Sequence, residues 1–285
     1  CSPKRARSRS VDGGIILAHI GSGLAQTNMR TFALLDQIVT VLGGTKLSFW
    51  PFLNGVGNDT FPYGSGNDGV RLSCSGVTTL ELNFDPTPFH ASHLFSYHND
   101  STTNVAAADN ANFSFVTGGL DDAFSLGIWV FMEEALGTAR SLIAKYGSTG
   151  LAREYDFRFG ADGKLVMELY DEDVDTTEIA TSAGTALTPF IWQFVTMTYD
   201  GGQAAPVIDL YLNATSVHDG TSIETGAYVS MEDLGASLMI GSRDAPATAA
   251  QVFQGRYALP FVTGKQLTAA EVTTLYGLGR ELIGI

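Results

Sequence analysis

The sequence has few of the residues that build disulfide frameworks, nucleic-acid-binding surfaces or membrane spans. Its two cysteines, Cys1 and Cys74, do not make a disulfide framework in a chain of 285 residues. Lys and Arg number 16 against 30 Asp and Glu, and the net charge of −14 repels phosphate backbones. The apolar stretch 13–25 is too short and too rich in glycine to cross a bilayer. We therefore expect neither nucleic acid nor a membrane as the main partner.

Motifs for nucleophilic, nucleotide-dependent and redox chemistry are also absent. The chain contains no Gly-x-Ser-x-Gly, no P-loop and no Cys-x-x-Cys. The basic stretch CSPKRARSRS (1–10) is the exception to the acidic balance and could contact nucleic acid or an acidic neighbouring surface, although a flexible soluble tail is the simpler interpretation.

What the sequence does contain is typical of a β protein. Hydrophobic residues make up 45% of the chain, charged residues only 16%, and glycine numbers 32. About a dozen short strand patterns, separated by turn residues, lie between 46 and 262. FSLGIWVFM (124–132) is apolar on both faces, as in a central strand covered on both sides, and Asp162–Gly163 predicts a tight hairpin turn. This pattern predicts two packed antiparallel sheets.

The two ends of the chain predict helices. Residues 28–42 have apolar spacing near the helical period and end at a Gly-Gly pair, which predicts a helix within an N-terminal arm (1–46) before a sandwich domain (47–285). This helix either packs on its own domain or anchors the chain in a larger assembly.

The stretch 265–279, KQLTAAEVTTLYGLG, predicts a short C-terminal helix that docks on the sandwich. Thr268 and Glu271 have capping-box spacing, and Leu267 and Val272 that of a hydrophobic staple. The glycines of LYGLG, at 277 and 279, predict its left-handed end.

The order of these features resembles the laminin-G-like domains of the concanavalin A-like lectin/glucanase superfamily. FSLGIWVFM is similar to a family strand that contains a tryptophan, and Trp129 stands in that position. FIWQFVTMTYDGG, with Trp192 and Asp200, is similar to a second strand of the family. LMIGSRD and the C-terminal helix motif are similar to the family's ending. With weaker upstream matches the resemblance covers about 240 residues. It implies an all-β, two-sheet antiparallel jelly-roll sandwich with a short closing helix.

The residues do not support the catalytic site that a glucanase of this superfamily would carry. Glucanases of this superfamily carry Glu-x-Asp-x-x-Glu on a concave strand, and the near match here, Asp173, Asp175 and Glu178, has Asp at the first position. Five acids crowd residues 170–178, as in a solvated hairpin end, and crowded exposed carboxylates stay ionised. We therefore expect no enzymatic activity and no certain cofactor.

Ligand candidates also follow from the resemblance. Many laminin-G-like domains bind Ca²⁺ at the rim, and Asp171, Asp173 and Asp175 are the candidates here, with a solvated acidic loop as the alternative. Lectin sandwiches bind sugars through aromatic and polar side chains of loops. The residues of this kind in predicted loops are Tyr63, Tyr97, Asn99, Asp100 and Asp244, each of which ordinary loop surface also explains. We predict Trp50, Trp129 and Trp192 to be core residues.

Two non-catalytic functions compete. The first is a structural virion protein of a tailed phage, such as a capsid decoration, head fibre or tail component. It would contact other virion proteins through residues 1–46, in a symmetric oligomer or array, and display a lectin-like sandwich to host glycans. The arm, the lack of disulfides and of a visible secretory signal, and the missing catalytic motifs favour it. The alternative is a secreted or cell-surface carbohydrate-binding or adhesion module, and a glycoside hydrolase comes third.

Overall fold

The structure is a computed structural model. It describes residues 22–44, 46–52, 73–75, 84–86, 95–100, 104–184, 186–202, 207–244 and 250–285. The elements in chain order are α1 (Ser22–Leu42), β1 (Leu47–Phe49), β2 (Ser73–Ser75), β3 (Phe84–Pro86), β4 (Phe95–Asp100), β5 (Asn104–Ala107), a 3-10 turn (Ala111–Phe113), β6 (Val116–Thr117), β7 (Leu120–Asp121), β8 (Phe124–Met132), β9 (Arg140–Gly147), β10 (Ala152–Phe159), β11 (Leu165–Asp171), β12 (Thr176–Ser182), β13 (Trp192–Tyr199), β14 (Ile208–Leu212), β15 (Thr215–Ser216), β16 (His218–Thr225), β17 (Leu238–Ile240), β18 (Gln254–Thr263) and α2 (Ala269–Ile283).

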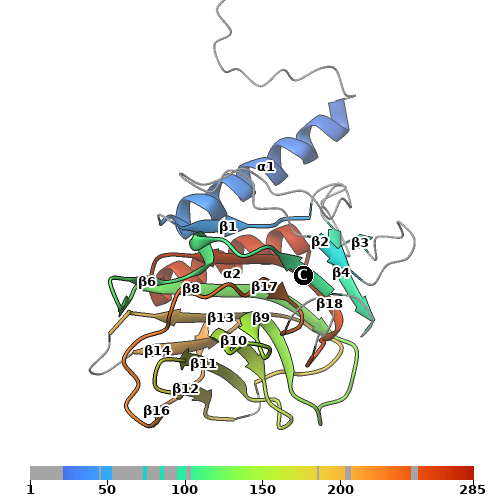
Figure 1. Ribbon diagram of the computed structural model, residues 1–285. Helices are drawn as coiled ribbons and strands as arrows, with labels where there is room; N and C mark the ends of the chain where they lie inside the picture. The colour runs from blue at the N-terminus through green and yellow to red at the C-terminus, as the bar shows by residue number, and fades with distance from the viewer. Residues whose placement is uncertain are drawn as a thin grey trace, which may run out of the picture.

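Two eight-stranded sheets form a sandwich, and two helices lie on one side of it (Figure 1). The helix-side sheet has the order β15-β14-β13-β8-β18-β4-β3, and β1 also pairs with β18. The open sheet has the order β16-β12-β11-β10-β9-β17-β5-β2. All described ladders are antiparallel. The sandwich predicted from the strand pattern and from the family resemblance is therefore confirmed.

Strand β8 shows how the sequence pattern builds two separate apolar layers. Its side chains alternate in direction, so Leu126 and Ile128 enter the core between the sheets while Trp129 enters a second cluster beneath the helices. Both faces of the strand are buried, which explains why 124–132 is apolar throughout. The predicted hairpin turn also forms, because Gly163 adopts φ 76° and its N–H donates to the Gly160 carbonyl at 2.9 Å.

Helix α2 begins as predicted and ends later than predicted. The Thr268 side chain accepts from the Glu271 N–H, and the Glu271 carboxylate accepts from the Thr268 N–H, which completes the capping box. The helix continues past Gly279 to Ile283 and ends at Gly284, which takes the left-handed conformation. Gly279 serves packing instead, because a Cβ there would overlap the indole ring of Trp129.

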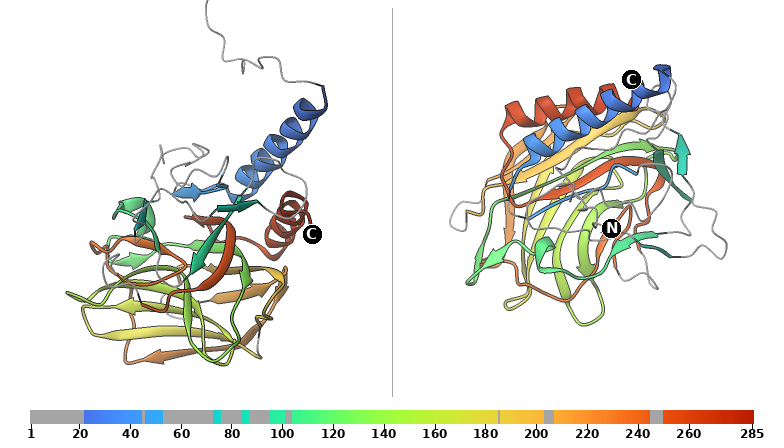
Figure 2. Two further views of the ribbon diagram at one scale, coloured as in Figure 1. Left: turned by 90° about the vertical axis from the view of Figure 1, so that its right-hand side faces the viewer. Right: turned by 90° about the horizontal axis from the view of Figure 1, so that it is seen from above.

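Helix α1 begins six residues earlier than predicted, at Ser22, and its last turns pack on the sandwich. Leu35, Ile38 and Leu42 are buried with residues of α2 and of the helix-side sheet. Seen from above, α1 and α2 lie side by side over the strands, whereas the Ser22 end points away from them (Figure 2). Of the two roles left open by the sequence, packing on its own domain describes residues 31–42, and docking through 1–46 stays a prediction.

Candidate functional site

The outer face of the open sheet carries a cluster of aromatic and charged side chains. The register sets Asp156 on β10 between Ala144 on β9 and Glu168 on β11, and all three turn away from the core. Tyr146 and Tyr170 follow two positions along the same strands and share this face. The sequence thus brings side chains from three neighbouring strands to one surface.

Two tyrosine rings form the centre of this cluster. The rings of Tyr146 and Tyr170 meet edge to face, with centroids 5.4 Å apart. The guanidinium group of Arg243 lies over Tyr146, 4.6 Å from the ring centroid, and that of Arg153 lies 5.2 Å from the centroid of Tyr170. Tyr146 and both arginines are partly exposed, so flat apolar and donor groups reach solvent together.

Ion pairs hold the neighbouring charges in place. Asp156 is buried, and its carboxylate accepts from the Ser141 hydroxyl at 2.8 Å and from Arg243 Nη1 at 3.2 Å. Arg158 lies between Asp156 and Glu168, with its Nη1 3.8 Å and 2.6 Å from the two carboxylates. Burial raises the pKa of Asp156, although Arg158, Ser141 and Arg243 oppose the shift. These positioned charges, with the two rings and Arg153, are called the tyrosine–arginine face below.

The tyrosine–arginine face is equipped for recognition and not for acid–base chemistry. Each of its two carboxylates is paired with a guanidinium group, so neither is a free proton donor. Guanidinium forks donate several fixed hydrogen bonds, and aromatic rings pack against apolar ring faces. This combination suits a ligand that is apolar on one side and rich in hydroxyl groups on the other.

The three aspartates predicted to bind Ca²⁺ lie at the β11–β12 turn, and two of them have other partners. Asp171 is buried, and its carboxylate accepts from the backbone N–H groups of Val174 at 3.3 Å and Val229 at 2.9 Å. Asp175 pairs with Arg153 at 2.8 Å, and Asp173 is exposed. In the described part of the chain, no three His, Cys, Asp or Glu side chains are grouped to hold a metal ion. The calcium site stays a prediction from the resemblance.

The predicted sugar-binding residues that the structure describes lie in strand β4 and at a loop. Tyr97, Asn99 and Asp100 belong to β4, hydrogen-bonded to β18, so their placement in a loop was wrong; their side chains lie outside the described set. Asp244 is buried, and its carboxylate accepts from the backbone N–H of Ser148 at 3.1 Å and from its hydroxyl. Tyr63 lies outside the described residues. A structural role at a loop thus accounts for Asp244.

The near match to a glucanase motif is also divided between two environments. Asp173 and Asp175 are exposed in the turn, whereas Glu178 is buried in β12 opposite Leu169, on the core side of the strand. Burial raises the pKa of Glu178. The three carboxylates therefore do not share the face that a retaining pair would need.

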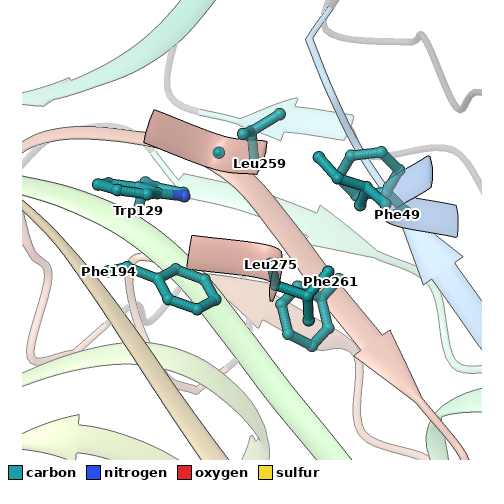
Figure 3. Close-up of a pocket in the computed structure, with 8 residues that line it drawn as sticks. Phe49, Trp129, Phe194, Leu259, Phe261 and Leu275 are labelled. Carbon is teal, nitrogen blue, oxygen red and sulfur yellow. The ribbon is translucent and has the colours of Figure 1, made fainter. Parts of the chain in front are cut away.

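A small apolar cavity lies between the helices and the helix-side sheet (Figure 3). Trp129, Phe194, Phe261 and Leu275 line it, and Leu259, at a bulge in β18 with φ 51°, turns toward it. Its volume is about 10 Å³, the space of about one water molecule. The cavity is therefore a packing gap beneath the helices, too small for a sugar or cofactor.

Comparisons with known proteins agree with this architecture. A family model described as the concanavalin A-like lectin/glucanases superfamily matches residues 99–273. Among solved structures, domain 4 of AbnA, a GH43 extracellular arabinanase from Geobacillus stearothermophilus in complex with arabinotriose, aligns with a TM-score of 0.54 and 14% identity, over 82% of this chain and 98% of that one.

Two toxin domains are similar as well. The binding domain of Paraclostridial Mosquitocidal Protein 1 aligns with a TM-score of 0.53 and 13% identity, over 84% of this chain and 52% of its own. The receptor binding domain of botulinum neurotoxin mosaic serotype C/D aligns with a TM-score of 0.51 and 13% identity, over 82% and 50%. The chain thus spans about half the length of these two domains. A comparison with curated proteins found no match.

Neither described helix meets the requirements for a membrane span, because neither α1 nor α2 combines the length and the apolar character that crossing a bilayer requires.

Proposed function

The chain belongs to the concanavalin A-like lectin/glucanases superfamily, and on this premise we propose that it binds carbohydrate, without catalysis, through the tyrosine–arginine face. The observation that carries the proposal is the stacking of Arg243 and Arg153 on the edge-to-face pair of Tyr146 and Tyr170. A sugar ring has apolar C–H faces and a rim of hydroxyl groups, so it can contact the partly exposed ring of Tyr146 and the guanidinium groups at once, while Tyr170 is buried behind them.

The rigidity of this face supports binding. Asp156 is fixed by Ser141 and Arg243, and Arg158 is fixed by Glu168, so the donors are oriented before a ligand arrives. Preorganised groups lose little conformational entropy on binding, which raises the affinity that a given set of contacts can provide.

The same pairs argue against hydrolysis. A glycosidase of either stereochemistry needs two carboxyl groups with different protonation states flanking the scissile bond. Asp156 and Glu168 are instead linked through the one guanidinium group of Arg158. We infer a binding module that presents a glycan-recognition surface, and the hydrolase alternative receives no support from this geometry.

A carbohydrate-binding role fits a protein that meets glycans outside the cell, as a secreted or surface module or as part of a virus particle. The virion role rested on an N-terminal arm that docks elsewhere, whereas Leu35, Ile38 and Leu42 of α1 are buried on the sandwich. We therefore place the secreted or surface module first, and assembly through residues 1–46 stays a prediction.

The test is binding to a glycan array, followed by titration calorimetry with the best ligand. Arabinotriose is a reasonable first soluble probe, because it occupies the structurally similar arabinanase domain. We expect Tyr146→Ala to weaken binding about tenfold, equivalent to about 1.4 kcal/mol. A binding wild-type protein whose affinity is unchanged in Tyr146→Ala and in Arg153→Met would contradict the assignment of this face.

Tyr276→Ala is a matched control for this experiment. Tyr276 is also a half-exposed tyrosine that stacks on another ring, but it lies on α2, against Trp129, on the opposite side of the sandwich. We expect its removal to leave sugar affinity unchanged, which separates a local loss of contacts from a general loss of stability.

A further inference from the structure

A second surface, on the outer face of the helix-side sheet, carries a row of planar groups that the helices leave partly uncovered. The register sets Trp192 on β13, Phe131 on β8 and Arg256 on β18 side by side. The rings of Trp192 and Phe131 have centroids 5.7 Å apart, and the Arg256 guanidinium lies 6.0 Å from the Phe131 centroid. Trp192 was predicted to be a core residue, but it is half-buried at this surface.

Two exposed apolar residues adjoin the row in the chain. Phe190 and Ile191, directly before Trp192, are 61% and 48% exposed. Phe190 takes a left-handed conformation with φ 64°, and its N–H donates to the Met132 carbonyl at 2.8 Å. This bond ties the Phe190 backbone to the end of β8, next to Phe131 in the chain, while the side chain stays exposed. Phe131, Phe190, Ile191 and Trp192 are called the aromatic platform.

The aromatic platform has a charged edge. Arg256 Nε donates to Glu133 Oε1 at 2.8 Å, and the Arg256 side chain is 38% exposed. Flat apolar rings bordered by fixed ionic groups match the two characters of a sugar ring, as the tyrosine–arginine face does.

We propose that the aromatic platform is a second carbohydrate-binding site, separate from the tyrosine–arginine face. A stable protein interface needs roughly 800 Å² from each partner, and four apolar side chains, two of them half-buried, supply only a fraction of that. A net charge of −14 opposes both self-association and binding to anionic lipid. A neutral oligosaccharide meets neither obstacle, and its hydroxyl groups can pair with Arg256 and Glu133.

Two sites on opposite faces of one sandwich would let a single molecule contact two glycan chains. On a surface dense in glycans, the second contact forms at high effective concentration, so modest single-site affinities combine into strong attachment. This consequence rests on the proposed function of the tyrosine–arginine face, whereas binding at the aromatic platform does not.

Tryptophan fluorescence reports this site specifically. Of the three tryptophans, Trp50 and Trp129 are each 1% exposed, so acrylamide quenching measures Trp192. We expect arabinotriose, xylotriose, cellotriose or laminaritriose, at millimolar concentration, to lower the quenching constant about twofold. Phe190→Ala should raise the triose concentration that gives half of this protection about tenfold. Tyr146→Ala should leave that concentration unchanged and weaken binding only at the tyrosine–arginine face. Thermal unfolding of each variant confirms that it is folded.

Two results would overturn the proposal. One is that none of the four trioses protects Trp192 and that the wild type and Phe190→Ala give identical glycan-array profiles. The other is a dimer, seen by sedimentation as the concentration rises, that Phe190→Ala abolishes, since the platform would then be an interface between copies. Loss of array binding in Tyr146→Ala alone tests the tyrosine–arginine face, so failure of one site is distinguishable from failure of the other.

Discussion

The two outer faces of the sandwich differ in their side chains and in what covers them. On the helix-side sheet the outward residues include Trp129, Phe194 and Phe261, and two helices bury them. On the open sheet the outward residues of the central strands include Asp156 and Glu168, which guanidinium groups neutralise and which no described helix covers. The helices are therefore a required third layer, because an apolar outer face exposed to water would aggregate.

The largest effect that separates the faces should come from Trp129. Trp129→Ala removes a side chain that is 1% exposed and stacked on Tyr276, and we expect a loss of about 3–5 kcal/mol in the free energy of unfolding. Trp192→Ala, at the half-exposed edge of the same face, should cost about 1 kcal/mol. Urea denaturation compares them. Equal losses would mean that the helix layer contributes little to the burial of Trp129.

Helix α1 provides the next test, because it decides whether the N-terminal segment is an arm or part of the fold. Leu35→Ala should destabilise the protein by about 2–4 kcal/mol, since Leu35 is fully buried beneath the helix. Gln37→Ala, on the exposed side of the same turn, is the control and should change stability by less than about 0.5 kcal/mol. If Leu35→Ala leaves the unfolding midpoint unchanged, the N-terminal segment is an arm, as the sequence alone suggested, and not part of the fold.

Burial of carboxyl groups should make the free energy of unfolding depend on pH. Burial raises the pKa of Glu154 from its ordinary 4.5 to about 7 although Lys145 opposes it, and burial also raises the pKa values of Asp121, Asp156 and Glu178. Between the unfolded and folded pKa values the folded state holds more protons, so stability falls as the pH rises. We expect a loss of about 1–3 kcal/mol between pH 5 and pH 8.

A matched variant sharpens this prediction. Glu154→Gln cannot ionise, so thermal unfolding across the same pH range should show a shallower decline than in the wild type. The Gln side chain still offers an acceptor for the Leu234 N–H, which Glu154 binds at 2.8 Å. A wild-type midpoint that rises from pH 5 to pH 8 would contradict the raised pKa values.

Local signals in the sequence predicted the fold, since they depend on neighbours in the chain. The continuous apolar run 124–132, the Asp162–Gly163 turn and the capping box of Thr268 each required residues only a few positions apart. The predicted end of α2 was wrong because Gly279 does not form a turn. A glycine is needed there because a Cβ would overlap Trp129, which lies 150 positions away in the chain. The neighbouring sequence does not indicate whether a glycine ends a helix or allows a close packing contact within it.

The candidate site could not be predicted in the same way. Tyr146, Tyr170 and Arg243 come from separate strands or their ends, and only the register of four strands brings them together. The signal that was available is alternation, because outward positions of predicted strands held Tyr, Arg, Asp and Glu where a fully covered strand would hold aliphatic residues. The clustered acids in the turn at 171–175 predicted a calcium site instead, but Arg153 and backbone amides already bind two of them.

The smallest effect concerns the cap of α2, which tests whether the helix layer depends on local signals or only on apolar burial. Thr268→Ala removes the acceptor of the Glu271 N–H, and we expect a loss of about 1 kcal/mol by urea denaturation. Thr273→Ala is the control, because Thr273 lies within the same helix, is exposed and bonds only the preceding turn, and alanine there should be neutral or slightly stabilising. If both variants unfold at the same urea concentration, burial of Val272 and Leu275 alone determines where the helix begins.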